Sequence, residues 1–93
     1  MGIIEFGCIY FKTTKDDLIG KTDYKNTLPR HMIWYYMHNV QNLSNKQIGD
    51  LFNRDKRSVM YGISNMRYRI SNQKKYSDMY DNFISEYEKE TAE

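Results

Sequence analysis

"LSNKQIGDLFNRDKRSVMYGISNMRYRI", residues 43–70, is the stretch that decides the fold. Ser44 and, three residues later, Gln47 form a capping-box pattern, in which each side chain bonds the backbone N–H of the other residue. Apolar residues then recur at helical spacing for two turns. The pattern predicts a helix that begins at Ser44 and ends near Phe52.

A second helix follows after the three residues "NRD" and runs from about Asp55 to Ser71. At 100° per residue, four apolar side chains of this segment fall within a narrow arc, which we expect to be buried. They are Val59, Ile63, Met66 and Ile70. Two helices joined by so short a turn indicate a helix-turn-helix over residues 44–71.

The opposite face of the second helix carries hydrogen-bonding side chains, among them Arg57, Tyr61 and Tyr68. Arg54 and Lys56 add two cations near the start of this helix, where the helix dipole disfavours positive charge. A phosphate bound there would gain from both the free N–H groups and the cations. We therefore interpret this end of the helix as a surface that meets nucleic acid.

The remainder of the chain is also helical in pattern, and no long period-two alternation supports a strand. The sequence predicts a single all-α domain over residues 1–93 with five to six helices. The other expected segments are a short helix over 3–11, a helical turn within 13–20, a polar basic loop over 21–26, a helix over 28–41, a last helix from about Ser77, and a frayed acidic tail over 88–93.

The net charge of +2 conceals an uneven distribution of charge. Residues 1–76 carry 13 basic and 6 acidic side chains, whereas residues 77–93 carry 1 basic and 6 acidic ones. A basic body is typical of proteins that bind polyanions. The single cysteine, Cys8, cannot form an internal disulfide, and no apolar run reaches the length of a membrane helix. We therefore expect no membrane association and a cytoplasmic location.

Four segments, taken in order, resemble one known family. They are "DDLIGK" (16–21), "PRHMIWYYMH" (29–38), residues 43–70, and "YSDMYDNFISEYEKE" (76–90). Together they are similar to the C-terminal DNA-binding domain of the bacterial replication initiator DnaA, which has a Trp-repressor-like helical fold. The resemblance covers nearly the whole chain and implies binding to double-stranded DNA.

The resemblance also implies particular contacts. Lys21 and Lys25 match the basic loop, which enters the minor groove, and Arg30 and His31 match the start of a helix that touches DNA. The helix-turn-helix would supply Asn45 and Lys46 at a phosphate, and Arg54, Asp55, Lys56, Arg57 and Ser58 in the major groove. We add Tyr61 because of its place on the exposed face. Asp55 is also expected to cap its helix.

Some residues depart from the family pattern. Asn53 stands where the family has two glycines, and Lys56 and Arg57 replace a histidine and a threonine. Because arginine prefers guanine, we expect a DNA site that differs from the family's usual one. We expect no ATPase motor in this chain. "GKT" at 20–22 lacks the earlier glycine of a phosphate-binding loop, since that position is Lys15, so no nucleotide site is predicted.

Enzymatic chemistry has little support. His31 and His38 are seven residues apart without further ligands, and no nucleophile motif occurs, so we expect no enzyme activity, metal or cofactor. The predicted function is sequence-specific binding of double-stranded DNA in replication or transcription regulation, in the cytoplasm or nucleoid of a bacterium or in the host of a phage. One alternative is a module that binds a replication or host protein through Trp34, Tyr61 and Tyr68. A third is an RNA-binding domain.

Overall fold

The computed structural model describes residues 1–20 and 24–92 of the 93-residue chain. Within this part the protein has six α-helices, one 3-10 helix and no strand. In chain order the elements are α1 (Ile3–Tyr10), α2 (Lys15–Gly20), η1 (Tyr24–Asn26), α3 (Thr27–Asn39), α4 (Asn45–Phe52), α5 (Lys56–Asn72) and α6 (Lys74–Thr91). The prediction of an all-α domain is confirmed.

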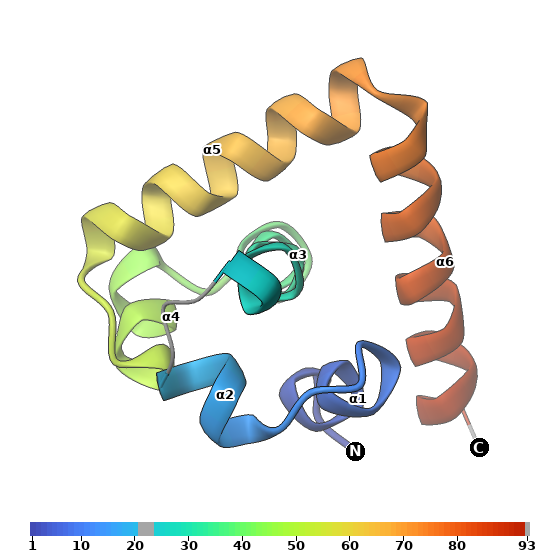
Figure 1. Ribbon diagram of the computed structural model, residues 1–93, viewed down its shortest axis with the longest axis horizontal. Coiled ribbons are helices and arrows are strands. Elements are labelled where there is room, and N and C mark those ends of the chain that lie inside the picture. The colour runs from blue at the N-terminus through green and yellow to red at the C-terminus, as the bar shows by residue number, and fades with distance from the viewer. Residues whose placement is uncertain (21–23, 93) are drawn as a thin grey trace.

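Helix α3 is the centre of the fold. Figure 1 views it nearly end-on, with α5 above it, α6 to the right, α1 below and α4 to the left. Its buried side chains point in several directions, which a helix enclosed by others requires. They include Met32, Ile33, Trp34, Tyr36 and Met37.

Val40 lies within the predicted helix over 28–41 but just beyond the end of the observed one. Its side chain is 53% exposed, because α3 ends at Asn39 and Val40 is only the C-cap residue. The chain then turns, with the N–H of Leu43 donating to the Met37 carbonyl at 3.1 Å. Since α4 begins shortly after this turn, the early end of α3 determines where the helix-turn-helix lies.

The first part of the chain packs on α3 through small helices. The predicted helices over 3–11 and within 13–20 are confirmed as α1 and α2, and Leu18 of α2 is fully buried. The predicted loop over 21–26 lies partly outside the described residues, and its last three residues form η1. The Thr13 hydroxyl donates to the Asn26 side chain at 2.6 Å, which joins the segment before α2 to the end of η1.

Helix α6 closes the fold by placing Phe83 against the aromatic rings of α1. It begins at Lys74 rather than near Ser77, and the expected start is wrong by one turn. The ion pair of Lys74 with Asp78, at 2.9 Å, spans this first turn. At the other end, where we expected a frayed tail over 88–93, α6 continues to Thr91, whose hydroxyl bonds the Tyr87 carbonyl.

Candidate nucleic acid interface

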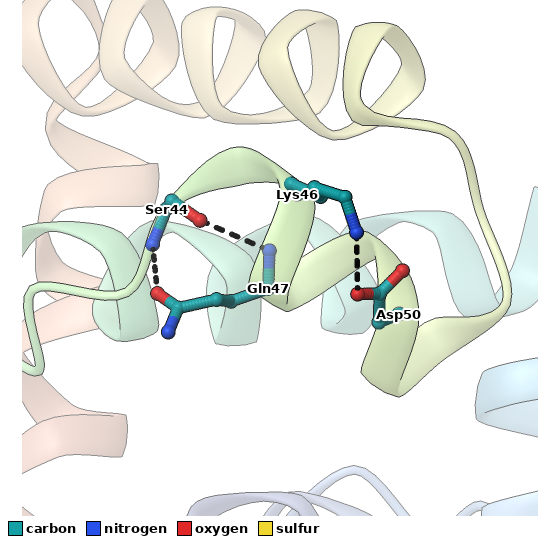
Figure 2. Close-up of polar contacts among 4 residues, drawn as sticks. All are labelled: Ser44, Lys46, Gln47 and Asp50. Carbon is teal, nitrogen blue, oxygen red and sulfur yellow. Dashed lines mark hydrogen bonds and ion pairs between the residues drawn. The ribbon is translucent and has the colours of Figure 1, made fainter.

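The helix-turn-helix begins with the capping box that the sequence predicts. The Ser44 hydroxyl accepts from the Gln47 N–H at 3.0 Å, and the Gln47 amide oxygen accepts from the Ser44 N–H at 2.8 Å (Figure 2). These two bonds satisfy backbone donors that α4 would otherwise leave without partners. The start of α4 is therefore fixed, and with it the direction of the residues that follow.

The turn between α4 and α5 depends on Gly49. Asn53 takes the left-handed conformation with φ 54°, and the N–H of Arg54 returns to the Gly49 carbonyl at 2.8 Å. A Cβ atom on Gly49 would lie 2.4 Å from the Arg54 carbonyl oxygen. Asn53 tolerates this conformation better than most residues, so one asparagine suffices where the family pattern has two glycines.

Asp55 caps α5, as predicted. Its carboxylate accepts from the backbone N–H of Ser58 at 2.7 Å. The pKa of Asp55 lies below its usual value. The largest cause is this backbone hydrogen bond, followed by a hydrogen bond from the Ser58 side chain and by the nearby Arg57 cation. The carboxylate is therefore ionised at neutral pH, and it offsets part of the positive charge that gathers at the start of α5.

The two faces of α5 divide as the sequence predicts. Val59, Ile63 and Met66 are at most 3% exposed, and Ile70 is half-buried. The opposite face is open to solvent, with Tyr61 58% and Tyr68 64% exposed.

The helix lies close to α3 because Gly62 has no side chain. A Cβ atom there would lie 2.7 Å from the Trp34 ring and 2.8 Å from His31. Because this contact fixes α5 against α3, it also fixes the direction of the exposed face.

Lys46 lies on the exposed side of α4, one turn from Asp50. Its ammonium and the Asp50 carboxylate are 3.2 Å apart, with the two side chains 77% and 70% exposed (Figure 2). An exposed pair of this kind contributes roughly 0.2–1 kcal/mol, so a phosphate can compete for the cation.

Asn45, the neighbour of Lys46, is half-buried, and its side-chain oxygen has no hydrogen-bond partner among the described residues. Both residues stand at the start of α4, where the resemblance implies a phosphate contact.

Arg30 requires a correction, because it lies in the core rather than on the surface. Its side chain is 4% exposed, and its Nε donates to the Leu18 carbonyl at 2.8 Å. That carbonyl belongs to the last turn of α2. Carbonyls in this position have no N–H donor within the helix. We therefore assign Arg30 to the joint between α2 and α3 and leave it out of the interface.

Arg54 has a related placement. One terminal nitrogen of its guanidinium donates to the Ile19 carbonyl at 2.6 Å and to the Phe52 carbonyl at 3.0 Å. The side chain is half-buried and ties the turn of the helix-turn-helix to the end of α2. These bonds hold the guanidinium in a structural position, so the open cations at the start of α5 are Lys56 and Arg57, both exposed.

His31 is half-buried beneath the surface of α3, with its ring 5.3 Å from that of Trp34. Burial, followed by the cations of Arg30 and Arg69, lowers the pKa of His31 to about 4. The imidazole is therefore neutral at pH 7 and can only offer a hydrogen bond, not a charge, to DNA. Lys25 is exposed in η1, and Lys21 lies outside the described residues.

One group from the predicted set stays exposed on α4, the turn and the first half of α5, and we call it the α4–α5 surface. Its members are Lys46, Asp55, Lys56, Arg57, Ser58 and Tyr61, all exposed. Arg67 is an exposed cation on α5 that is not among the predicted contacts. At 100° per residue it lies about 20° from Lys56 around the helix, and this spacing is the signal that could have found it.

The described part of the chain lacks two other kinds of feature. It holds no group of three or more potential metal ligands. None of its helices combines the length and the apolar character that crossing a membrane requires.

Comparison with known proteins agrees with the architecture. Residues 2–66 match the family described as the bacterial DnaA protein helix-turn-helix. The chain is also 27% identical, over 79 residues, to the chromosomal replication initiator protein DnaA from each of two strains of Leptospira biflexa serovar Patoc.

Each of these two alignments covers 84% of this chain but only 18% of the relative. The chain therefore spans about a fifth of the length of these relatives. The family match includes α1 to α4 and the first part of α5, and thus the whole α4–α5 surface. The protein belongs to the bacterial DnaA helix-turn-helix family.

Proposed function

We propose that the protein binds double-stranded DNA through α4 and α5, with the first half of α5 in the major groove. The observation that carries this proposal is the α4–α5 surface. Lys46, Lys56 and Arg57 project from two capped helices, and the turn between them is fixed by Gly49. Family membership supports the same function. Exposed cations on a rigid support suit a phosphate backbone, whose neutralisation releases counterions.

The proposed contacts divide into two kinds. Lys46 at the start of α4 and Lys56 at the start of α5 would bind phosphates and set the position of the domain. Lys25 would extend the contact from η1. Arg57 and Tyr61 lie one turn apart on the exposed face of α5 and would reach base edges, with Arg57 bidentate to a guanine. We also propose that no bound nucleotide takes part in these contacts.

We further propose that the binding is sequence-specific and acts in the regulation of replication or transcription, by occupying a DNA site. Selection from a randomised duplex library, followed by sequencing, would define that site. Fluorescence anisotropy would then compare Arg57→Ala with Lys74→Ala, a control cation on α6 outside the α4–α5 surface. Arg57→Ala should cost about 1–3 kcal/mol at the selected site and less on random duplex. Equal losses on both duplexes would argue against a base contact by Arg57.

Lys46→Ala tests the phosphate contact. It should weaken binding to all sequences alike and reduce the salt slope by about one. Lys74→Ala is the matched control, since Lys74 also forms an exposed ion pair one turn along its helix, with Asp78. If the two variants behave alike, Lys46 is not at the interface.

A protein partner remains the second candidate function, and one observation favours it. Tyr61 and Tyr68 are 58% and 64% exposed, and exposed aromatic side chains are typical of protein interfaces. Trp34, which the sequence analysis included in this surface, is only 2% exposed and packs against Phe52, so it is excluded. Binding to a replication protein that persists at high salt, without any shift of duplex DNA, would favour this function.

A further inference from the structure

A cavity of about 360 Å³ opens between the start of α3, the second half of α5 and the start of α6. Its volume lies within the range of small-molecule sites, which is roughly 300–1,000 Å³. Leu28, Pro29 and Met66 supply apolar walls. The cavity is thus larger and more apolar than an inorganic anion alone would need.

No described residue balances the positive charge of the cavity. Lys25 and Arg69 line it, and neither forms an ion pair with a described residue. No Asp or Glu from the described part of the chain lines it. Two cations in a concave, partly apolar site focus a positive potential, which raises the local concentration of anions.

Hydrogen-bonding and aromatic groups complete the lining. The ring nitrogens of His31 have no hydrogen-bond partner among the described residues, and Asn65 is exposed beside them. The Arg69 guanidinium lies 4.9 Å from the centre of the Tyr76 ring, so the aromatic ring holds the cation at the edge of the cavity. Such a site offers donors at one side and flat apolar surface at the other.

We infer that this cavity binds a small organic phosphate, a phosphate monoester that carries a planar ring. Its phosphate carries a charge close to −2 at neutral pH. It binds the cations of Lys25 and Arg69 and accepts a hydrogen bond from His31. Its ring packs against Leu28 and Pro29. The site lies outside the α4–α5 surface, although Lys25 is also a proposed DNA contact, and its occupation does not require a duplex.

Titration of the full chain with phenyl phosphate, without DNA, tests the inference. Calorimetry should show one saturable site with a Kd of about 0.1–1 mM. Phenyl phosphate should also raise the pKa of His31, followed by NMR, because an anion beside an imidazole favours its charged form. Inorganic phosphate should bind at least about tenfold more weakly, since it lacks the ring.

Variants identify the site. Arg69→Gln keeps most of the side chain but removes the charge, and it should weaken binding by about tenfold or more. Arg67→Gln removes a charge from the same helix outside the cavity and should change binding less than about twofold. Lys25→Gln, at an exposed position, gives a second measure if Arg69→Gln disturbs the packing of Tyr76.

The inference is overturned by any of three results with folded protein. The first is no saturable binding of phenyl phosphate up to about 10 mM. The second is equal affinity for inorganic phosphate, and the third is an equal loss in Arg67→Gln and Arg69→Gln. Because the assay contains no DNA, these results leave the proposed duplex binding unaffected.

Discussion

Replacing Gly49 with alanine should destabilise the domain by about 2 kcal/mol and disturb the turn between α4 and α5. The added Cβ would lie 2.4 Å from the Arg54 carbonyl oxygen, a backbone atom that cannot rotate away. Overpacking of this kind costs about 1–3 kcal/mol. If the Arg54 backbone moves, the 2.8 Å hydrogen bond from its N–H to the Gly49 carbonyl is also weakened, which costs about 1 kcal/mol. The better helix propensity of alanine returns up to about 1 kcal/mol.

Thermal unfolding followed by circular dichroism measures this effect. For a domain of 93 residues, an unfolding entropy of about 0.2 kcal/mol/K converts 2 kcal/mol into a fall in Tm of about 10 °C. Gly20→Ala is the matched control, because a Cβ there lies within 4 Å of no described atom outside its own chain neighbours. Gly20→Ala should keep its Tm within about 2 °C of the wild type. If the Tm of Gly49→Ala equals that of the wild type, the close approach of Gly49 to the Arg54 carbonyl is refuted.

Three further predictions follow from the site. Arg54→Ala should lower the free energy of unfolding by about 1–3 kcal/mol in the absence of DNA, because two carbonyls lose a charged donor. An unchanged urea unfolding curve would show that Arg54 has no structural role and is available for DNA. Asp50→Asn should strengthen binding to all duplexes by freeing Lys46, as anisotropy would detect, and weaker binding would contradict the phosphate contact. His31 has a folded pKa of about 4 against an ordinary 6.5, so the unfolded chain binds its proton first and stability falls as pH drops between these values. His31→Gln should reduce that fall in urea midpoints between pH 7 and 4.5, and an equal fall in both proteins would show that His31 is not the cause.

The parts of the fold that short-range patterns determine were predictable from the sequence. The capping box of Ser44 and Gln47 and the Asp55 cap involve residues three apart, and both are present as expected. The buried stripe of α5 follows from helical periodicity alone. These signals are strong because each depends on a side chain and its own local backbone.

The placement of two arginines was not predictable, because their partners are distant in sequence. Arg30 bonds a carbonyl 12 residues away, and Arg54 bonds one 35 residues away. Both acceptors, Leu18 and Ile19, are in the last turn of α2, where carbonyls lack partners within the helix. From the sequence alone, both arginines look like exposed cations near the helix-turn-helix. In the fold, Arg30 instead joins α2 to α3, and Arg54 joins α2 to the turn after α4.

The ends of helices were also hard to predict from the sequence. Val40 fits the apolar stripe of α3 by periodicity, yet the helix ends one residue earlier and exposes it. Similarly, Lys74 and Asp78 carry no apolar signal, and their ion pair lies in a first turn of α6 that the hydrophobic pattern missed. Apolar periodicity locates the buried middle of a helix but not an end that polar contacts determine.

The most direct test of DNA binding through the α4–α5 surface is the affinity for a selected duplex at several salt concentrations. With three or four phosphates neutralised by Lys25, Lys46, Lys56 and neighbouring groups, log K should fall against log salt with a slope of about −3 to −4. Arg57→Ala should lower the affinity for that duplex more than for random DNA. No detectable binding at low salt, or an affinity that does not change with salt, would contradict the account.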